Sequence, residues 1–195
     1  MINYKEALEP DCTYHIYNRA VGNEKLFITE ANYKFFLKKY QEYISPFADT
    51  FCYCLMPNHF HLLIRIKEKN KLKPLINQIQ KVPEYCSLQF SNFFNSYSKA
   101  FNKQEKRKGV LFMRPYSRKK ISDMDYFRKV VLYIHRNPVV AGLCSKPIEW
   151  RYSSYKSLLT DSATLLKREE VVDVFGDKEN FRHIHEGQKL MEKLI

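Results

Sequence analysis

Hydrophobic and polar residues alternate along three short stretches of the chain, which is the pattern of β-strands that bury one face. The first stretch covers residues 12–19, with the sequence CTYHIYNR. The second and third, FADTFCYCLM at 47–56 and HFHLLIRIK at 59–67, are separated only by a Pro-Asn pair. Such a pair between two runs is typical of a tight turn, so the pattern predicts a hairpin here. A fourth strand is predicted within GVLFMRPYSRKKI, residues 109–121.

Two longer segments between the predicted strands carry helix signals. Thr29 precedes the stretch EANYKFFLKKYQEYI (30–44) and Pro46 follows it, so we expect a helix that begins after Thr29 and stops before Pro46. Residues 72–98 are expected to be mostly helical, with an interruption near Pro83, because proline breaks the helical hydrogen-bond ladder.

A further helix is predicted from Ser122 to Asn137. Ser122 is a suitable N-cap, and two aspartates follow it in the first turn, where negative charge suits the helix dipole. Pro138 disfavours helical backbone at the residue before it, which sets the predicted end at Asn137. One stripe at helical spacing is expected to face the core: Met124, Phe127, Val131 and Ile134.

The predicted elements follow the order strand, helix, strand, strand, helix, strand, helix. Beyond them, the region from 139 to 195 reads as short helices and loops, with a charged tail from Lys167. This order predicts an α+β sandwich with a mainly antiparallel sheet. The length of 195 residues fits one domain with an appendage.

Charge adds a candidate partner. Lysine and arginine exceed aspartate and glutamate by 33 to 21, giving a formal net charge of +12. Such an excess favours a polyanion, with nucleic acid the leading case, although a merely soluble basic protein has the same composition. Between Asn102 and Lys120 the only acidic residue is Glu105, and Phe112 and Tyr116 lie among the cations. The cations of this segment are Lys103, Lys106, Arg107, Lys108, Arg114, Arg118, Lys119 and Lys120. Cations interleaved with aromatic rings are typical of an edge that follows a phosphate backbone.

Other features bear on the compartment. No apolar run approaches the roughly 18 residues of a membrane span, and the N-terminal MINYKEALEPD is polar and acidic, unlike a signal peptide. The five cysteines form no CxxC pair, and their odd number argues against a disulfide framework. We therefore expect a cytoplasmic protein with reduced cysteines and no membrane partner.

Two histidines stand one residue apart in PNHFHLLIR (57–65). Successive strand side chains point to opposite faces, so His59 and His61 share one face while Phe60 and Leu62 point to the other. Two imidazoles on one face suit a metal ion or a phosphate, although a pair of hydrogen-bonded surface histidines gives the same pattern.

A structural zinc site is the competing hypothesis for a metal at this hairpin. Cys52 and Cys54 alternate in the preceding strand, so CxC followed by HxH supplies four zinc-type ligands. All four side chains would have to converge across the hairpin, whereas cysteine is also a common core residue of strands.

The predicted helix 122–137 carries a second stripe, formed by Tyr126, Val130, Tyr133 and Asn137. Tyr133 and Asn137 are four residues apart, so they project from one face about a turn apart. Against a strand with two imidazoles, such a helix would assemble two nitrogen ligands, one oxygen ligand and a nucleophile for phosphorus.

These motifs together resemble a known family. YCLMPNHFHLLIR, followed by YIHRNPVVAGL and WRYSSY, is similar to the single-tyrosine HUH transposases, in which a histidine, a hydrophobic residue and a histidine form the first motif. The REP-associated tyrosine transposases and their insertion-sequence relatives are the nearest in appearance. Supporting segments are YHIYNRAVGNEKLF, FSNFFNSYSKAFNK, GVLFMRPYSRKKI and VFGDKENFR. The resemblance covers most of the chain, in order.

The resemblance implies a ferredoxin-like (RRM-like) fold and a role for each residue of the site. His59 and His61 would be ligands of a divalent metal, Mg²⁺ or Mn²⁺, and Tyr133 the nucleophile. Asn137 would complete the metal site at a position where the insertion-sequence branch often has glutamine. The family domain would span 1–150, with 151–195 as a helical tail packed on it.

The implied reaction is metal-dependent cleavage and rejoining of single-stranded DNA through a 5′-phosphotyrosine, in transposition or in a domesticated activity on hairpin repeats. A non-catalytic module that binds single-stranded or hairpin DNA is the alternative. Because the long tail resembles the REP-associated group, we expect a monomer, with a homodimer the other possibility.

Several neighbouring residues receive secondary expectations. Tyr126 is the reserve nucleophile, and His135 points away from the Tyr133 stripe and is not expected to be a ligand. Arg65 follows His61 onto the histidine face and is a candidate for holding a DNA phosphate, although a solvated role fits equally. Trp150 is expected to pack rather than to stack on a base. The full predicted DNA-binding set is Arg65, Lys106, Arg107, Lys108, Arg114, Arg118, Lys119 and Lys120.

Overall fold

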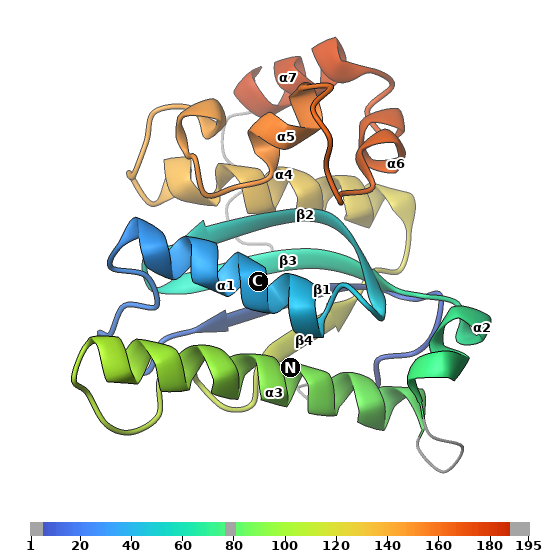
Figure 1. The fold of residues 1–195 in the computed structure, drawn as a ribbon. Helices are drawn as coiled ribbons and strands as arrows, with labels where there is room; N and C mark the ends of the chain where they lie inside the picture. Colours follow the sequence, from blue (N-terminus) through green and yellow to red (C-terminus); the bar gives the residue numbers. More distant parts are fainter. Residues whose placement is uncertain (1–5, 77–80, 188–195) are drawn as a thin grey trace.

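The structure is a computed structural model that describes residues 6–76 and 81–187. Within them, four strands form one antiparallel sheet in the order β2-β3-β1-β4 (Figure 1). The strands are β1 (Thr13–Arg19), β2 (Ala48–Met56), β3 (His59–Ile66) and β4 (Ser117–Lys120). The main helices are α1 (Glu30–Tyr43), α3 (Val82–Gln104) and α4 (Met124–Val140). The shorter ones are α2 (Lys69–Leu72), η1 (Lys73–Leu75), η2 (Pro147–Glu149), α5 (Tyr155–Leu159), α6 (Arg168–Asp173) and α7 (Lys178–Gly187).

The connection of these elements is that of a ferredoxin-like fold. β1, α1, β2, β3, α3 and β4 follow one another as β-α-β-β-α-β, with the first and third strands paired in the middle of the sheet. The predicted α+β sandwich with a mainly antiparallel sheet and a C-terminal helical extension is therefore confirmed. No helix in the described ranges is long and apolar enough to cross a membrane.

The sheet buries a different core on each face. In β3, Phe60, Leu62 and Ile64 point towards α1 and α3, which lie together on one side of the sheet (Figure 1). The alternate positions face α4 and the C-terminal helices on the other side, where Leu63 joins a second apolar cluster. The period-two pattern of the strand thus separates an aromatic-rich core from the layer that carries the histidines.

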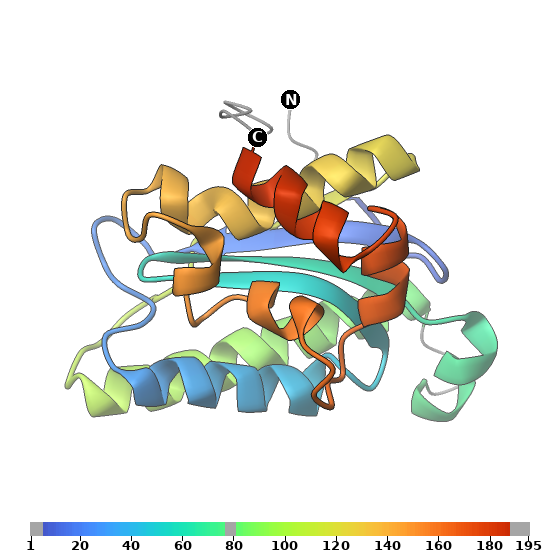
Figure 2. The same ribbon diagram turned by 90° about the horizontal axis from the view of Figure 1, so that it is seen from above.

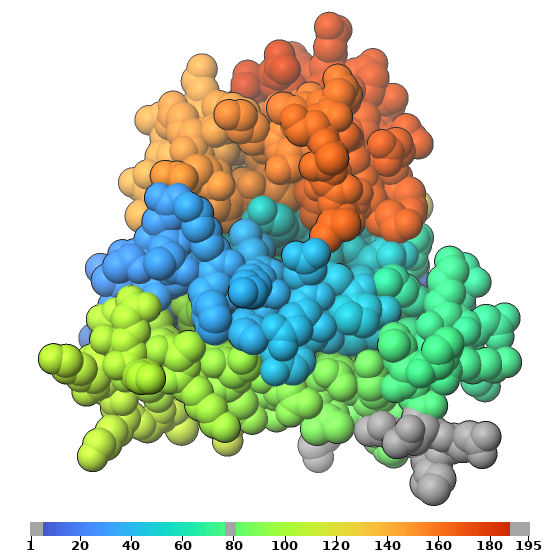
Figure 3. Space-filling model, viewed as in Figure 1, coloured from blue at the N-terminus to red at the C-terminus, as the bar shows by residue number. Residues whose placement is uncertain are grey.

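The C-terminal segment is joined to the free edge of β2. Leu55 N–H donates to the Tyr152 carbonyl, Ser154 N–H donates to the Tyr53 carbonyl, and Lys167 N–H donates to the Thr50 carbonyl, at 2.9, 3.0 and 2.9 Å. These contacts cover backbone groups that an edge strand would otherwise leave open to another chain. From above, α7 lies beside α4 (Figure 2), and the space-filling view shows the orange and red tail packed against the body of the molecule (Figure 3).

A chain of buried polar groups connects α7, α4 and β2. His185 Nδ1–H donates to the Phe181 carbonyl, which leaves its Nε2 as an acceptor for His135 Nδ1–H at 3.1 Å. His135 Nε2 then accepts from the Ser154 hydroxyl at 2.9 Å, and Ser154 Oγ accepts from Tyr53 N–H. In this arrangement both imidazoles are neutral, and the Ser154 hydroxyl, which also lies 3.2 Å from the Tyr53 carbonyl, donates to His135. His135 therefore packs the tail against the domain.

We expect the stability of the fold to fall on acidification through this chain. Burial lowers the pKa of His185 to about 4 and holds that of His135 well below its usual value. The unfolded chain therefore binds more protons between about pH 4 and 6.5, and the free energy of unfolding decreases as the pH falls through that window. His185→Gln should reduce the slope of the unfolding free energy against pH, within this window, by up to about 1.4 kcal/mol per pH unit. Urea unfolding at several pH values measures this pH dependence. His183→Gln, on the exposed side of α7, is the control. Equal slopes in wild type and His185→Gln would contradict the assignment.

Helix boundaries differ from the sequence expectation at Pro138 and at the end of α3. Pro138 lies inside α4, which continues to Val140, because a proline in the last turn removes only one helical bond. At the end of the helix, Ala141 N–H donates to the Asn137 carbonyl and Leu143 N–H donates to the Pro138 carbonyl, both at 2.9 Å. Helical structure stops at Leu75 and resumes at Val82, so the expected interruption near Pro83 is present, and residues 77–80 of the expected stretch lie outside the described residues. Pro83 itself sits in the first turn of α3, where its missing N–H costs nothing. α3 then runs to Gln104, past the predicted end.

Two smaller expectations for α4 are wrong. The N-cap is Asp123 rather than Ser122: the Asp123 carboxylate accepts Tyr126 N–H at 2.7 Å, and the Ser122 hydroxyl donates to the same carboxylate. Met124, expected on the core stripe, is 60% exposed. Phe127, with the rest of that stripe, is buried as expected.

The fourth strand predicted within residues 109–121 is confirmed as β4, but the residues before it are mostly irregular. β4 begins only at Ser117, since Pro115 has no N–H to give to the ladder. Residues 111–113 nevertheless follow the end of β1: Val21 N–H donates to the Leu111 carbonyl and Met113 N–H to the Arg19 carbonyl, at 3.0 and 2.9 Å. The segment 109–116 therefore forms a wall beside β1 instead of a full strand.

Candidate active site

The two histidines of β3 lie under α4, on the sheet face away from α1 and α3. In β1, the register pairs Tyr17 with His61 and places His15 on the same face. Tyr133 of α4 lies above them, with its ring centroid 5.3 Å from that of His61. A cavity of about 760 Å³ opens here, with both histidines of β3, Tyr17, Tyr133 and Arg114 among the residues that line it.

His59 and Asn137 present an unusual contact. His59 Nδ1 lies 2.7 Å from Asn58 Oδ1, which can only accept, so the proton of the neutral imidazole is on Nδ1 and Nε2 has a lone pair. Asn137 Nδ2 donates to the Tyr133 carbonyl at 3.2 Å, which turns its Oδ1 towards His59 Nε2 at 3.4 Å. Burial lowers the pKa of His59, which keeps the ring neutral near pH 7. His59 Nε2 and Asn137 Oδ1 are therefore two acceptors that face each other with no proton between them.

His61 contributes another acceptor. Its side chain is buried, and its Nδ1 lies 3.0 Å from His15 Nε2. Its Nε2 is buried and has no hydrogen-bond partner among residues 6–76 and 81–187. Desolvation holds the pKa of His61 well below its ordinary value, reinforced by the neighbouring His15 and His59. When His61 donates from Nδ1 to His15, the lone pair of its Nε2 is left for another electrophile.

This set of atoms suits a cation. Two neutral imidazole nitrogens and an amide oxygen are acceptors without matching donors, and metal ligation requires histidine in the neutral form. A metal-ligating histidine usually donates its other N–H to an acceptor, which Asn58 provides for His59 and His15 can provide for His61. The chemistry of the donor set therefore fits the predicted divalent ion.

The zinc alternative does not fit. Cys52 and Cys54 are fully buried in the apolar cluster under α4, and burial raises their thiol pKa values well above the ordinary range. No group of three or more His, Cys, Asp or Glu side chains suited to a metal is present in the described residues. The two cysteines are core residues of β2.

Tyr133 and Tyr126 occupy different surroundings on α4. Tyr133 is half-buried and lies over the histidines, with its ring 6.0 Å from that of His15. Tyr126 is about 10 Å earlier along the helix axis, where Lys119 Nζ lies 4.8 Å from its ring centroid. The structure thus brings Tyr133, and not the reserve candidate, to the cavity.

Strand alternation divides the predicted DNA-binding cations of β4. Lys119 is exposed on the α4 side, opposite His15. Arg118 points to the other face, where it donates to Ser87 of α3 and to the Tyr116 hydroxyl at 3.3 and 3.1 Å. Lys120 forms an ion pair with Glu9 at 2.7 Å.

The remaining cations are also dispersed. Arg114 is exposed and lines the cavity of the histidines, while Lys106 and Lys108 are exposed on the turn after α3. Arg107 is half-buried and bonds Asn102 Oδ1 at 2.7 Å. The predicted DNA contacts of these residues remain predictions.

Arg65 lies at the opposite end of β3 from His59, about 20 Å along the strand. Its guanidinium forms a bidentate contact with Glu170 of α6, at 2.7 and 3.0 Å, and a longer one with Asp49 at 3.4 Å. The carboxylates of Glu170 and Asp49 would compete with a DNA phosphate for the Arg65 guanidinium. Trp150 donates from its indole to the Leu55 carbonyl at 3.0 Å, in agreement with its expected packing role.

Sequence reasoning did not identify His15. Burial lowers its pKa to about 3, so it is a neutral hydrogen-bond partner for His61. The available signal was the alternation in TYHIYNR, which puts His15, Tyr17 and Arg19 on one face of β1. The missing information was the register that aligns this face with His59 and His61.

The sequence profile described as "Transposase IS200 like" matches residues 9–137, which include all four described strands and end at Asn137. The chain therefore belongs to the IS200-like transposase family, a family of DNA-processing enzymes. It is 29% identical over 112 residues to a protein of Haemophilus influenzae named as a REP-associated tyrosine transposase, covering 56% of this chain and 60% of that protein. This chain thus spans about 60% of the length of that relative.

A solved structure has the same fold. It is the structure of a REP-associated tyrosine transposase bound to a REP hairpin, with a TM-score of 0.61, 14% sequence identity, and coverage of 86% of this chain and 94% of the other.

Proposed function

We propose that this chain cleaves and rejoins single-stranded DNA at hairpin-forming repeats, with Tyr133 as the nucleophile. The observation that carries the proposal is the set of acceptors, His59 Nε2, His61 Nε2 and Asn137 Oδ1, assembled beside Tyr133 within one chain. Membership of a transposase family supports DNA as the substrate. The relative that was solved with a REP hairpin supports the choice of a hairpin.

His59, His61 and Asn137 would hold the divalent cation. When bound, Mg²⁺ or Mn²⁺ would withdraw charge from the scissile phosphate and help to orient it. The protein's own contribution is to fix the ligands before the substrate arrives. Asn58 holds the His59 ring, and the Tyr133 carbonyl holds the Asn137 amide.

His15 acts as a positioning residue. By accepting the Nδ1 proton of His61, it fixes the tautomer in which Nε2 is free to bind a metal. Its burial on the α4 side of the sheet also excludes water that would compete for the same proton.

Tyr133 carries the covalent step. Its phenolic oxygen bonds to phosphorus while the P–O3′ bond breaks, so the downstream strand becomes a 5′-phosphotyrosine. The phenol loses its proton and the departing O3′ gains one, which leaves a free 3′-OH on the upstream strand. In rejoining, a 3′-OH attacks the same phosphorus and the Tyr133 oxygen departs. The phosphodiester energy is retained throughout, so no nucleotide cofactor is needed.

Asymmetric labelling tests this proposal. The protein is incubated with Mg²⁺ or Mn²⁺ and a hairpin oligonucleotide taken from a repeat of its own genome, labelled at either the 3′ or the 5′ end. We expect the 3′ label to become covalently attached to the protein, and the 5′ label to appear only in a released shorter fragment. A 5′ label on the protein would reverse the assigned polarity. Hairpin binding without any adduct would favour the second candidate, a non-catalytic DNA-binding module.

A further inference from the structure

Arg19 is the last residue of β1, and its backbone is held on both sides. In the β1–β3 pairing it lies opposite His59, and the next residue, Ala20, donates its N–H to the Asn58 carbonyl at 2.8 Å. On the other side, the Arg19 carbonyl accepts Met113 N–H at 2.9 Å. Because Arg19 shares a sheet face with His59, its side chain lines the cavity of the histidines. The strand therefore fixes where this side chain begins, while the side chain itself is exposed.

The guanidinium of Arg19 is not neutralised by a carboxylate. Within residues 6–76 and 81–187 it has no ion pair and no hydrogen bond. The guanidinium groups of Arg65, Arg107 and Arg151 differ, since each pairs with a glutamate, at 2.7, 3.4 and 2.9 Å. The described residues that line the cavity of the histidines include no aspartate or glutamate. The positive charge of Arg19 is therefore available to an anion that enters this cavity.

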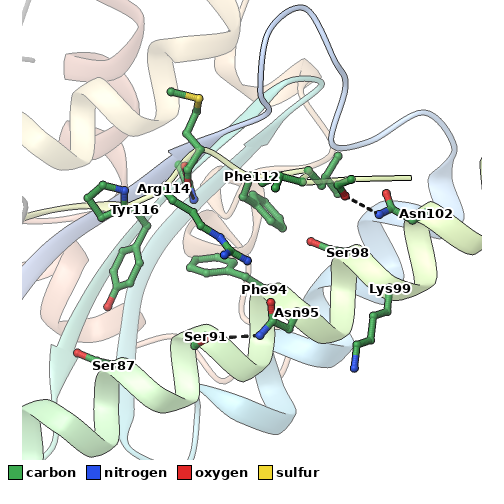
Figure 4. A pocket seen from close by; sticks show the side chains of 16 residues that line it. Ser87, Ser91, Phe94, Asn95, Ser98, Lys99, Asn102, Phe112, Arg114 and Tyr116 are labelled. Carbon is green, nitrogen blue, oxygen red and sulfur yellow. Dashed lines mark hydrogen bonds between the residues drawn. The ribbon is translucent and has the colours of Figure 1, made fainter. Parts of the chain in front are cut away.

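A second arginine of the cavity lining, Arg114, points elsewhere. Figure 4 shows its guanidinium turned towards α3, into a separate cavity of about 790 Å³ between α3 and the segment 109–116. The charge of Arg19 acts on the histidine side instead. Burial is the largest cause that lowers the pKa of His59, and the positive charge of Arg19 lowers it further. Arg19 thus supplies positive charge directly beside the proposed metal ligands.

A phosphodiester under attack by Tyr133 gains negative charge on its two non-bridging oxygens. The metal site of His59 and His61 would serve one of these oxygens, which leaves the charge on the other without a partner. A guanidinium suits that oxygen, because it is planar, always charged, and donates short charge-assisted hydrogen bonds. Donors that are fixed in advance near developing charge often make the largest single contribution to catalysis.

We propose that Arg19 is a catalytic residue, which binds a non-bridging oxygen of the scissile phosphate and stabilises the charge that develops there as Tyr133 attacks. This inference rests on the proposed function: the Tyr133 oxygen bonds to phosphorus, the P–O3′ bond breaks, the phenol loses its proton and O3′ gains one. Arg19 keeps its own protons throughout, because a guanidinium is not deprotonated in proteins. Its contribution is electrostatic and adds to that of the metal ligands.

Methylphosphonate scanning tests the contact by fluorescence anisotropy without added metal. The probes are hairpin oligonucleotides with unpaired nucleotides on both sides, in which one phosphate at a time is a methylphosphonate of defined configuration at phosphorus. Such a group is uncharged and lacks one of the two non-bridging oxygens. In wild type we expect one configuration, at the phosphate that is cleaved in the adduct assay, to weaken binding by about tenfold. Arg19→Gln should bind the unmodified probe about tenfold more weakly and show no further loss with that methylphosphonate.

Arg182→Gln is the matched control for both measurements. It removes one positive charge from an exposed position of α7, outside the cavity lining, and should retain the wild-type penalty.

The rate of adduct formation separates a catalytic role of Arg19 from binding alone. At saturating hairpin, Arg19→Gln should form the adduct about 100-fold more slowly than wild type, because a fixed charge is missing in the transition state. Arg19→Lys keeps the charge but not the planar guanidinium, and should recover part of the rate. Arg182→Gln should react at the wild-type rate.

Equal methylphosphonate penalties in wild type and Arg19→Gln would overturn the proposal, as would a coupling of Arg19 to a phosphate other than the one that is cleaved. An unchanged adduct rate for Arg19→Gln at saturating hairpin would overturn it as well. All three results leave the proposed function intact, because wild type would still form the Tyr133 adduct. If wild type forms no adduct, the proposed function fails, while a penalty for one configuration that Arg19→Gln removes would still support the contact of Arg19 with a phosphate.

Discussion

Tyr133→Phe is expected to abolish the covalent protein–DNA adduct while leaving hairpin binding within about twofold of wild type. The substitution removes only the attacking oxygen, and the ring that packs over His61 remains. An acid–base or metal role for this residue would leave some cleavage, whereas loss of the nucleophile removes the covalent product itself. Denaturing gels with the 3′-labelled hairpin measure the adduct, and anisotropy measures binding.

Tyr126→Phe is the matched control for this prediction. Tyr126 is another half-buried tyrosine of α4, but it lies next to Lys119 rather than the histidines. This variant should form the adduct at the wild-type rate. Adduct formation by Tyr133→Phe together with its loss in Tyr126→Phe would reassign the nucleophile.

His61→Ala is expected to slow adduct formation by about 100-fold or more and to weaken Mn²⁺ binding measured by calorimetry. It removes the buried acceptor that has no partner in the described part of the chain, so the cation would lose one of its three proposed ligands. His15→Gln leaves that ligand but removes the imidazole that fixes its tautomer, and should weaken Mn²⁺ binding by about tenfold to 100-fold. Wild-type Mn²⁺ affinity in His61→Ala would remove this histidine from the metal site.

Mixing the two inactive variants distinguishes a site within one chain from a shared site. Tyr133 and His61 of the same chain are already in ring contact, which supports the expected monomer. Tyr133→Phe mixed with His61→Ala should therefore give no more adduct than either alone. Restoration of the adduct would mean that one chain's tyrosine serves the other chain's histidines in a dimer.

The parts of the site that could be predicted from sequence are those governed by local periodicity. The shared face of His59 and His61 follows from the two-residue repeat of a strand, and the alignment of Tyr133 with Asn137 follows from the helical repeat. Both hold in the structure because each pair belongs to one regular element.

The parts that could not be predicted depend on how elements meet. His15 approaches His61 through the β1–β3 register, which the sequence does not state. Arg65 meets Glu170 of α6, more than a hundred residues later in the chain. The sequence of the basic segment 102–120 suggests one surface, but alternation in β4 sends Arg118 and Lys119 to opposite faces.

The central claim is that one tyrosine oxygen, on α4 above the two histidines, becomes bonded to DNA. The direct measurement is mass spectrometry of the purified adduct after digestion with a nuclease and a protease. The account predicts a nucleotide attached through its 5′-phosphate to the peptide that contains Tyr133, and to no other peptide. A nucleotide found on a peptide containing Tyr126 or any other residue in place of Tyr133 would contradict it.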